Sequence, residues 1–125
     1  MTFSELVDET VEYYTTNPRS LDTNRNNCVY AGPNGERCAA ARLCDESASD
    51  FEKMDNNEVS EWRHVTHLAT LKPEYAHFTV EQIGFLQRLH DLRRNWLKPN
   101  GEGGTGGLSR SGFLYVEFIK KTTEQ

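Results

Sequence analysis

Long apolar runs are missing from this 125-residue chain: nowhere does it contain a stretch of about 18 apolar residues, the length a helix needs to cross a bilayer. Met1 to Glu9 contains acids where a secretory signal peptide has a basic start and an apolar stretch. These absences argue against a membrane partner and against export. They predict a small soluble protein that stays in the cytoplasm.

Basic residues are fewer than acidic ones: 14 lysines and arginines stand against 19 aspartates and glutamates, for a formal net charge of -5. Binding to nucleic acid favours a positive surface that neutralises phosphates, so the composition argues against a nucleic-acid partner. The exception is a basic group of Arg88, Arg93, Arg94 and Lys98 around the end of a predicted helix. It is either the usual enrichment of cations at a helix C-terminus or part of a binding surface.

Cysteine is scarce and odd in number, with Cys28, Cys38 and Cys44 as the three thiols. In a reducing cytoplasm, free thiols are the expected state. A zinc site formed by these cysteines with His64 or His67 is the metal hypothesis, but structural zinc sites usually offer ligand pairs about two to four residues apart. The cysteines are spaced more widely, so we predict buried, structural thiols and no bound metal or other cofactor.

No local signature of a cysteine hydrolase surrounds Cys38, although this residue is predicted at the N-terminus of a short helix. A helix N-terminus and the flanking Arg37 and Arg42 would favour a thiolate there. His90, followed by Asp91, is the candidate base. A small cysteine- or metal-dependent enzyme using Cys38 and His90 is therefore the alternative to a protein without catalytic function.

Turn and helix signals predict an α+β fold, mainly helical, in a single domain over residues 1–125. Gly-Pro and Asn-Gly at residues 32–35 predict a β-hairpin within residues 28–38. About four helices are expected, and their predicted ranges are residues 2–16, 39–44, 59–71 and 80 to about 97. Capping boxes are predicted at the starts of the first and last of these, from Thr2 with Glu5 and from Thr79 with Gln82.

The C-terminal region combines a glycine-rich tract with an apolar run. Residues 100–112 contain six glycines and predict a flexible loop, and residues 45–58 predict an acidic connecting loop. Residues 113–119 are rich in aromatic and β-branched side chains and predict a third strand. A short helix from Ser111 is the alternative, because periodicity cannot decide so short a run.

Three polar segments, residues 17–27, 45–58 and 100–112, are longer than a domain of this size requires for folding. Long loops of this kind are often functional, so we predict a non-enzymatic protein that binds a protein partner through charged surface residues. The oligomeric state does not follow from the sequence. The predicted partner-binding residues are Asp45, Glu46, Asp50, Glu52, Asp55, Arg88, Arg93 and Arg94.

Several short motifs resemble those of small uncharacterised proteins of phages, prophages and bacteria. They are Tyr13-Tyr14, Asn17-Pro18-Arg19, Cys28-x-Tyr30, Gly35-x-x-Cys38-Ala39 and Leu86-Gln87-x-Leu89-His90-Asp91. The chain departs from these proteins at residues 40–43, where it has Ala-Ala-Arg-Leu in place of a glycine and aliphatics. The resemblance implies no activity; it implies a small accessory protein, a phage-encoded modulator or inhibitor of a host protein or complex, located in the host cytoplasm.

Overall fold

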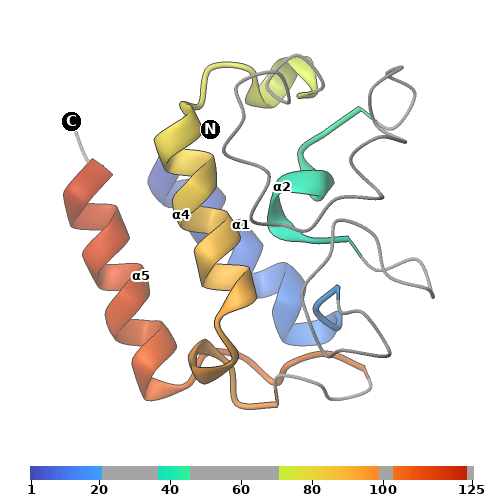
Figure 1. Cartoon of the computed structure of the whole chain (residues 1–125), viewed down its shortest axis with the longest axis vertical. Coiled ribbons are helices and arrows are strands. Elements are labelled where there is room, and N and C mark those ends of the chain that lie inside the picture. Colours follow the sequence, from blue (N-terminus) through green and yellow to red (C-terminus); the bar gives the residue numbers. More distant parts are fainter. Residues whose placement is uncertain (21–36, 46–70, 99–102, 124–125) are drawn as a thin grey trace. The chain divides into compact units, whose positions relative to one another are not determined.

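The computed structural model describes residues 1–20, 37–45, 71–98 and 103–123 (Figure 1). The elements in these ranges are α1 (Phe3–Thr16), α2 (Ala39–Arg42), the 3-10 helix η3 (Pro73–Tyr75), α4 (Val80–Asp91), the 3-10 helix η4 (Arg93–Asn95) and α5 (Arg110–Thr123). The chain divides into two compact units. Unit 1 comprises Met1–Arg19 and Arg88–Gln125, and unit 2 comprises Ser20–Gln87, so the division falls inside α4.

The predicted α+β fold is wrong for the part of the chain that the structure describes, which is mainly helical and contains no β-strand. The third strand predicted at residues 113–119 belongs to α5. Gly112, Val116 and Ile119 recur at helical spacing and are all buried, so one helical face covers the core. Burial of this face outweighs the strand preference of the aromatic residues between them, and the helical alternative is the correct one.

Other predicted elements lie wholly or mostly outside the described residues. The hairpin at residues 28–38 is described only at Arg37 and Cys38, and the helix at residues 59–71 only at Leu71. Of the acidic loop at residues 45–58, only Asp45 is described. These elements and the single domain therefore stay predictions.

In unit 1, α1 begins as predicted, with a complete capping box between Thr2 and Glu5. One face of α1 is buried, at Phe3, Leu6, Val7, Thr10 and Tyr14. Helix α5 is in contact with α1. Their exposed edges are joined by an ion pair between Lys120 Nζ and Asp8 Oδ1 at 2.5 Å.

The described part of the glycine tract, residues 103–109, bonds to the end of α1 and to the segment after η4. Thr105 donates two hydrogen bonds to the carbonyl oxygen of Tyr14, from its amide (2.9 Å) and its hydroxyl (2.7 Å). Gly104 lies so close to α1 that a Cβ there would stand 2.5 Å from the Thr15 carbonyl oxygen. The tract therefore supplies partners for carbonyls that the end of a helix leaves unbonded.

In unit 2, the four-residue helix α2 is held by side chains at its start. Cys38 is its N-cap and accepts a hydrogen bond from the Ala41 amide at 3.3 Å, while Gln87 Oε1 accepts one from the Ala40 amide at 2.9 Å. After α2, Cys44 and Leu71 form an isolated antiparallel bridge. The predicted capping box of Thr79 and Gln82 is present at the start of α4. In the ranges described, no helix combines the length and hydrophobicity needed to cross a bilayer.

Candidate functional site

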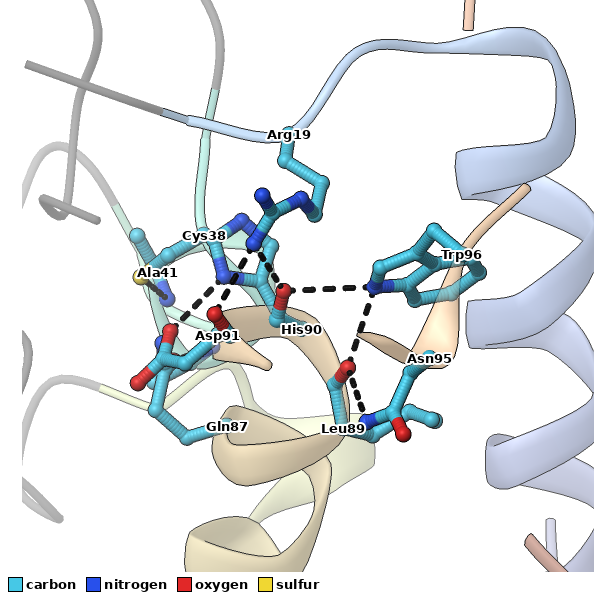
Figure 2. A network of polar contacts seen from close by, with 10 residues as sticks. Arg19, Cys38, Ala41, Gln87, Leu89, His90, Asp91, Asn95 and Trp96 are labelled. Atoms are coloured by element: carbon cyan, nitrogen blue, oxygen red, sulfur yellow. Dashed lines mark hydrogen bonds and ion pairs between the residues drawn. The ribbon is translucent and has the colours of Figure 1, made fainter. Parts of the chain in front are cut away.

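The end of α4 carries a network of buried polar contacts within unit 1 (Figure 2). Arg19 Nη1 donates to the carbonyl oxygens of His90 (2.8 Å) and Asp91 (2.9 Å). The Leu89 carbonyl oxygen accepts hydrogen bonds from Asn95 Nδ2 and Trp96 Nε1, both at 3.1 Å, and Trp96 Nε1 also reaches the His90 carbonyl oxygen at 3.3 Å. Three carbonyls of the last turn are thus satisfied by side chains.

The sequence predicts that this helix ends near Leu97, but α4 ends at Asp91. The network explains the difference. A continuing helix would bond the same three carbonyls to the amides of residues 93–95. Side chains occupy them instead, and the Asn95 amide bonds to the Leu92 carbonyl oxygen at 3.0 Å within η4. Trp96 is buried as expected of a core residue, whereas Leu97, predicted on the same apolar face, is 61% exposed.

His90, the predicted base, is fully buried at the end of α4. Its Nδ1 lies 2.9 Å from Asp91 Oδ1, and its ring meets that of Tyr14 edge-on, with the ring centroids 5.1 Å apart. Burial lowers the pKa of His90 below its ordinary value of 6.5, the hydrogen bond and charge of Asp91 oppose this, and the charge of Arg19 adds to it. The neutral imidazole is therefore the form that the fold favours.

Cys38, the predicted nucleophile, is also fully buried and belongs to unit 2, whereas His90 belongs to unit 1. Its sulfur accepts a hydrogen bond from the Ala41 amide. At most N-caps, a side-chain oxygen accepts this bond. In this conformation the thiol is buried and bonded as a cap, which is a structural role. The catalytic pair of Cys38 and His90 stays a prediction.

The predicted zinc ligands are described only in part. Cys28 and His67 lie outside the described residues, and the Cys44 thiol donates to the Ala40 carbonyl oxygen at 3.4 Å. Among the residues that the structure describes, no three His, Cys, Asp or Glu side chains form a group that could hold a metal ion.

The predicted partner-binding residues are also described only in part. The acids Glu46, Asp50, Glu52 and Asp55 lie outside the described ranges, and Asp45 is exposed in unit 2. Arg88, Arg93 and Arg94 are exposed in unit 1 around the end of α4. Their solvent exposure is compatible with partner binding and also with a solvated helix end.

The clearest candidate for a functional surface is the α5 outer face, which we define as Phe113, Leu114 and Phe118. These side chains are 57%, 57% and 54% exposed, while Val116 and Ile119 of the same helix are buried. A surface helix of a monomeric protein normally places polar residues opposite its buried stripe. Here exposed apolar side chains stand among the charged residues Arg110, Glu117 and Lys121 on the side of α5 away from its buried stripe.

Charged residues lie within and beside the α5 outer face. Arg110, Glu117 and Lys121 are exposed on α5, and Leu114 lies one helical turn from Arg110 and from Phe118. On the other flank, the rings of Tyr115 and Phe118 lie 6.2 Å apart between centroids. Burial raises the pKa of Tyr115, and the nearby charge of Arg88 opposes this. The charges on and beside this face are therefore mixed: Arg88, Arg110, Lys120 and Lys121 are cations, and Asp8 and Glu117 are carboxylates.

Sequence reasoning missed the residues that build these sites, for different reasons. Arg19 was assigned to a polar loop, and nothing local indicates that it bonds residues far along the chain. The α5 outer face was missed because residues 113–119 were interpreted as a strand. One signal was available: Ser109 caps the helix, since its hydroxyl accepts from the Gly112 amide at 3.2 Å.

Comparison with known proteins adds no assignment: the chain matches no protein-family model, no curated protein and no solved structure.

Proposed function

We propose that this chain is a non-enzymatic, protein-binding accessory protein that contacts its partner through the α5 outer face. The observation that carries the proposal is the exposure of Phe113, Leu114 and Phe118 on a helix whose opposite side is already buried. Leu114 and Phe118 lie one helical turn apart and form an exposed apolar pair, and exposed apolar patches often mark interaction sites.

The energetics favour a contact at this position. Burying a Leu or Phe side chain contributes about 1.5–3 kcal/mol relative to leaving it exposed, so three half-exposed side chains offer a partner a substantial gain. Large aromatic side chains on a rigid helix also lose little conformational freedom on binding. The α5 outer face therefore has the composition of an interface centre.

The resemblance to phage and prophage proteins supports a finer version of this proposal. In it, the partner is a host protein or complex, and the chain modulates or inhibits that partner by occluding its surface. This version depends on the short sequence motifs alone, whereas the binding surface depends on the geometry of α5.

The test is a quantitative capture experiment with the intact chain. We expect the wild-type protein to retain a stoichiometric partner from a lysate of a phage host, and the Leu114→Asp/Phe118→Asp variant to retain at least about tenfold less. A carboxylate at each position would be desolvated in the interface at a cost that binding cannot offset.

The matched control is Leu97→Asp, which places the same charge on another exposed leucine of unit 1. It should capture the partner as the wild type does, and circular dichroism with thermal melting should show that all variants are folded. A stoichiometric partner that survives the double substitution, or the absence of any such partner, would contradict the proposal.

A further inference from the structure

We propose that unit 1 has a second binding surface, a cationic corner that binds the phosphate backbone of a single-stranded nucleic acid. We define the cationic corner as Arg93, Arg94, Lys98 and Arg110, where η4, the glycine tract and α5 meet. The inference goes beyond the proposed function and does not depend on it. It follows from where the fold places these cations, from their lack of carboxylate partners and from the distribution of charge along the chain.

The fold brings Arg110 beside Arg94, although the two are far apart in the sequence. Ser109, which directly precedes Arg110, donates a hydrogen bond from its hydroxyl to the Arg94 carbonyl oxygen. The Ser109 amide donates to the Asn95 carbonyl oxygen at 2.9 Å, and η4 and α5 are in contact. The sequence groups Arg94 only with its neighbours in the chain, and tertiary structure adds Arg110 to them.

Lys98 extends the cationic corner along the glycine tract. Its amide donates to the Thr105 carbonyl oxygen at 2.7 Å, and its side chain passes Gly106, where a Cβ would stand 3.6 Å from Lys98 Cδ. The backbone from Arg94 to Lys98 spans at most about 14 Å. The corner is therefore short enough to contact a few consecutive phosphates of one strand.

Local helix electrostatics do not account for these cations. The carbonyls at the end of α4 already accept hydrogen bonds from three buried side chains, so Arg93 and Arg94, which follow that end, are not needed as caps. Arg110 is the first residue of α5, where the helix dipole favours an acid, and the first turn of α5 contains no acid. A cation in this position opposes the dipole, and a bound anion would offset that cost.

Within the described chain, carboxylates do not neutralise the cationic corner. Arg94, Lys98 and Arg110 are exposed, and none of them forms an ion pair with a described carboxylate. Asp91 is the acid closest to Arg93 in the sequence, but its carboxylate lies 2.9 Å from His90 Nδ1. Exposed cations held near one another repel, and an anionic ligand relieves this repulsion.

Charge is unevenly distributed along the sequence. Residues 1–87 contain 7 lysines and arginines against 15 aspartates and glutamates, a net charge of -8, whereas residues 88–125 contain 7 against 4, a net charge of +3. Such asymmetry is typical of chains that bind nucleic acids or membranes. The overall excess of acids therefore describes the chain as a whole and does not describe the segment that contains the cationic corner.

The chemistry of the cationic corner favours a phosphate backbone over an acidic protein segment. Three of its four cations are arginines, whose planar guanidinium groups pair with phosphate through two parallel hydrogen bonds. Every nucleotide of a strand carries a phosphate, so a strand presents charge to a short surface in any register. A protein segment would need its acids spaced to match the same cations.

The test is fluorescence anisotropy with the intact chain and a fluorescein-labelled oligothymidylate of about 16 nucleotides. We expect binding at about 50 mM salt, with the logarithm of the association constant falling against the logarithm of salt concentration with a slope no steeper than about -3, the value for four phosphates of a single strand. Arg94→Glu/Arg110→Glu should weaken binding at least about tenfold and make the slope shallower by about 1.4.

The matched control is Lys72→Glu/Lys121→Glu, which changes the net charge equally at lysines outside the cationic corner. Lys121 lies about 16 Å along α5 from Arg110. The control should keep the affinity and salt slope of the wild type, and equal weakening by the two double substitutions would overturn the inference. Circular dichroism checks folding, and Arg94→Gln/Arg110→Gln replaces the glutamate variant if that variant is unfolded.

Competition and cosedimentation test the other anionic partners. Unlabelled oligothymidylate should displace the probe, polyglutamate of equal charge should displace it at least about tenfold less well, and phosphatidylserine vesicles should leave the chain in solution. Equal displacement by polyglutamate would assign the cationic corner to an acidic protein. Vesicle binding lost in Arg94→Glu/Arg110→Glu would assign it to a membrane. Either result, or the absence of oligothymidylate binding, would overturn the nucleic-acid inference.

Discussion

Arg19 is the residue whose role differs most from its setting in the sequence. It follows the Asn17-Pro18 stop of α1 and is only 4% exposed, with its guanidinium donating to two carbonyls at the end of α4. Long cationic side chains are seldom buried unless they are paired. Here the carbonyl end of a helix, which carries a partial negative charge, accepts the cation.

We expect Arg19→Ala to lower the free energy of unfolding by about 1.5–3 kcal/mol, the usual contribution of hydrogen bonds that involve a charged group. The carbonyl of Asp91 would lose its side-chain donor, and that of His90 would keep only Trp96. Urea denaturation measures the difference. Arg94→Ala, an exposed arginine of unit 1, should change stability by no more than about 0.5 kcal/mol; equal effects of the two substitutions would contradict the capping role of Arg19.

His90 makes stability depend on pH. Its pKa is lowered in the folded chain, mainly by burial, from an ordinary value of 6.5. Below pH 6.5 the unfolded chain takes up a proton that the folded chain resists, so stability present above 6.5 is lost as the pH falls toward the folded pKa. The free energy of unfolding then changes by at most about 1.4 kcal/mol per pH unit.

The measurement is the free energy of unfolding from urea titrations between pH 7.5 and about 5.5, a window above the ordinary titration of carboxylates. We expect stability to fall across it in the wild type and in His77→Gln, which removes an exposed histidine. The decline should be smaller in His90→Gln. An unchanged pH dependence in His90→Gln would show that other groups cause it.

At the scale of single elements, α5 is positioned by a close contact at Gly112. A Cβ on this residue would stand 2.1 Å from the Asn95 carbonyl oxygen and 2.9 Å from Leu108 Cδ2. The backbone of α5 thus approaches the end of η4 as closely as only glycine allows. Of the two glycines that lie within helices in the described chain, Gly84 has open space around it and Gly112 does not.

This contrast gives a matched pair of substitutions. Gly84→Ala should stabilise the chain by about 0.5–1 kcal/mol, because alanine favours a helix. Gly112→Ala should destabilise it by about 1–3 kcal/mol, because overpacking outweighs the same helical preference. Thermal melting compares the two, and a stabilising Gly112→Ala would contradict the close packing of α5 on η4.

At the scale of the whole molecule, the candidate sites differ in their exposure to solvent. The predicted chemistry lies at buried residues, with Cys38 capping α2 in unit 2 and His90 inside the polar network of unit 1. The exposed apolar surface lies on α5 in unit 1. The proposed contact with a partner uses the exposed side chains of α5, whereas Cys38 and His90 are enclosed by the fold.

Where α1 and α4 begin was determined by the sequence alone, because a capping box joins residues three apart. The end of α4 was decided by tertiary structure, since Arg19 bonds to a carbonyl 71 residues away. The same is true of α5: Phe113, Leu114 and Phe118 have the composition of a strand or of a buried helix. Only the packing of Gly112, Val116 and Ile119 against the rest of unit 1 determined which side chains of α5 face outward.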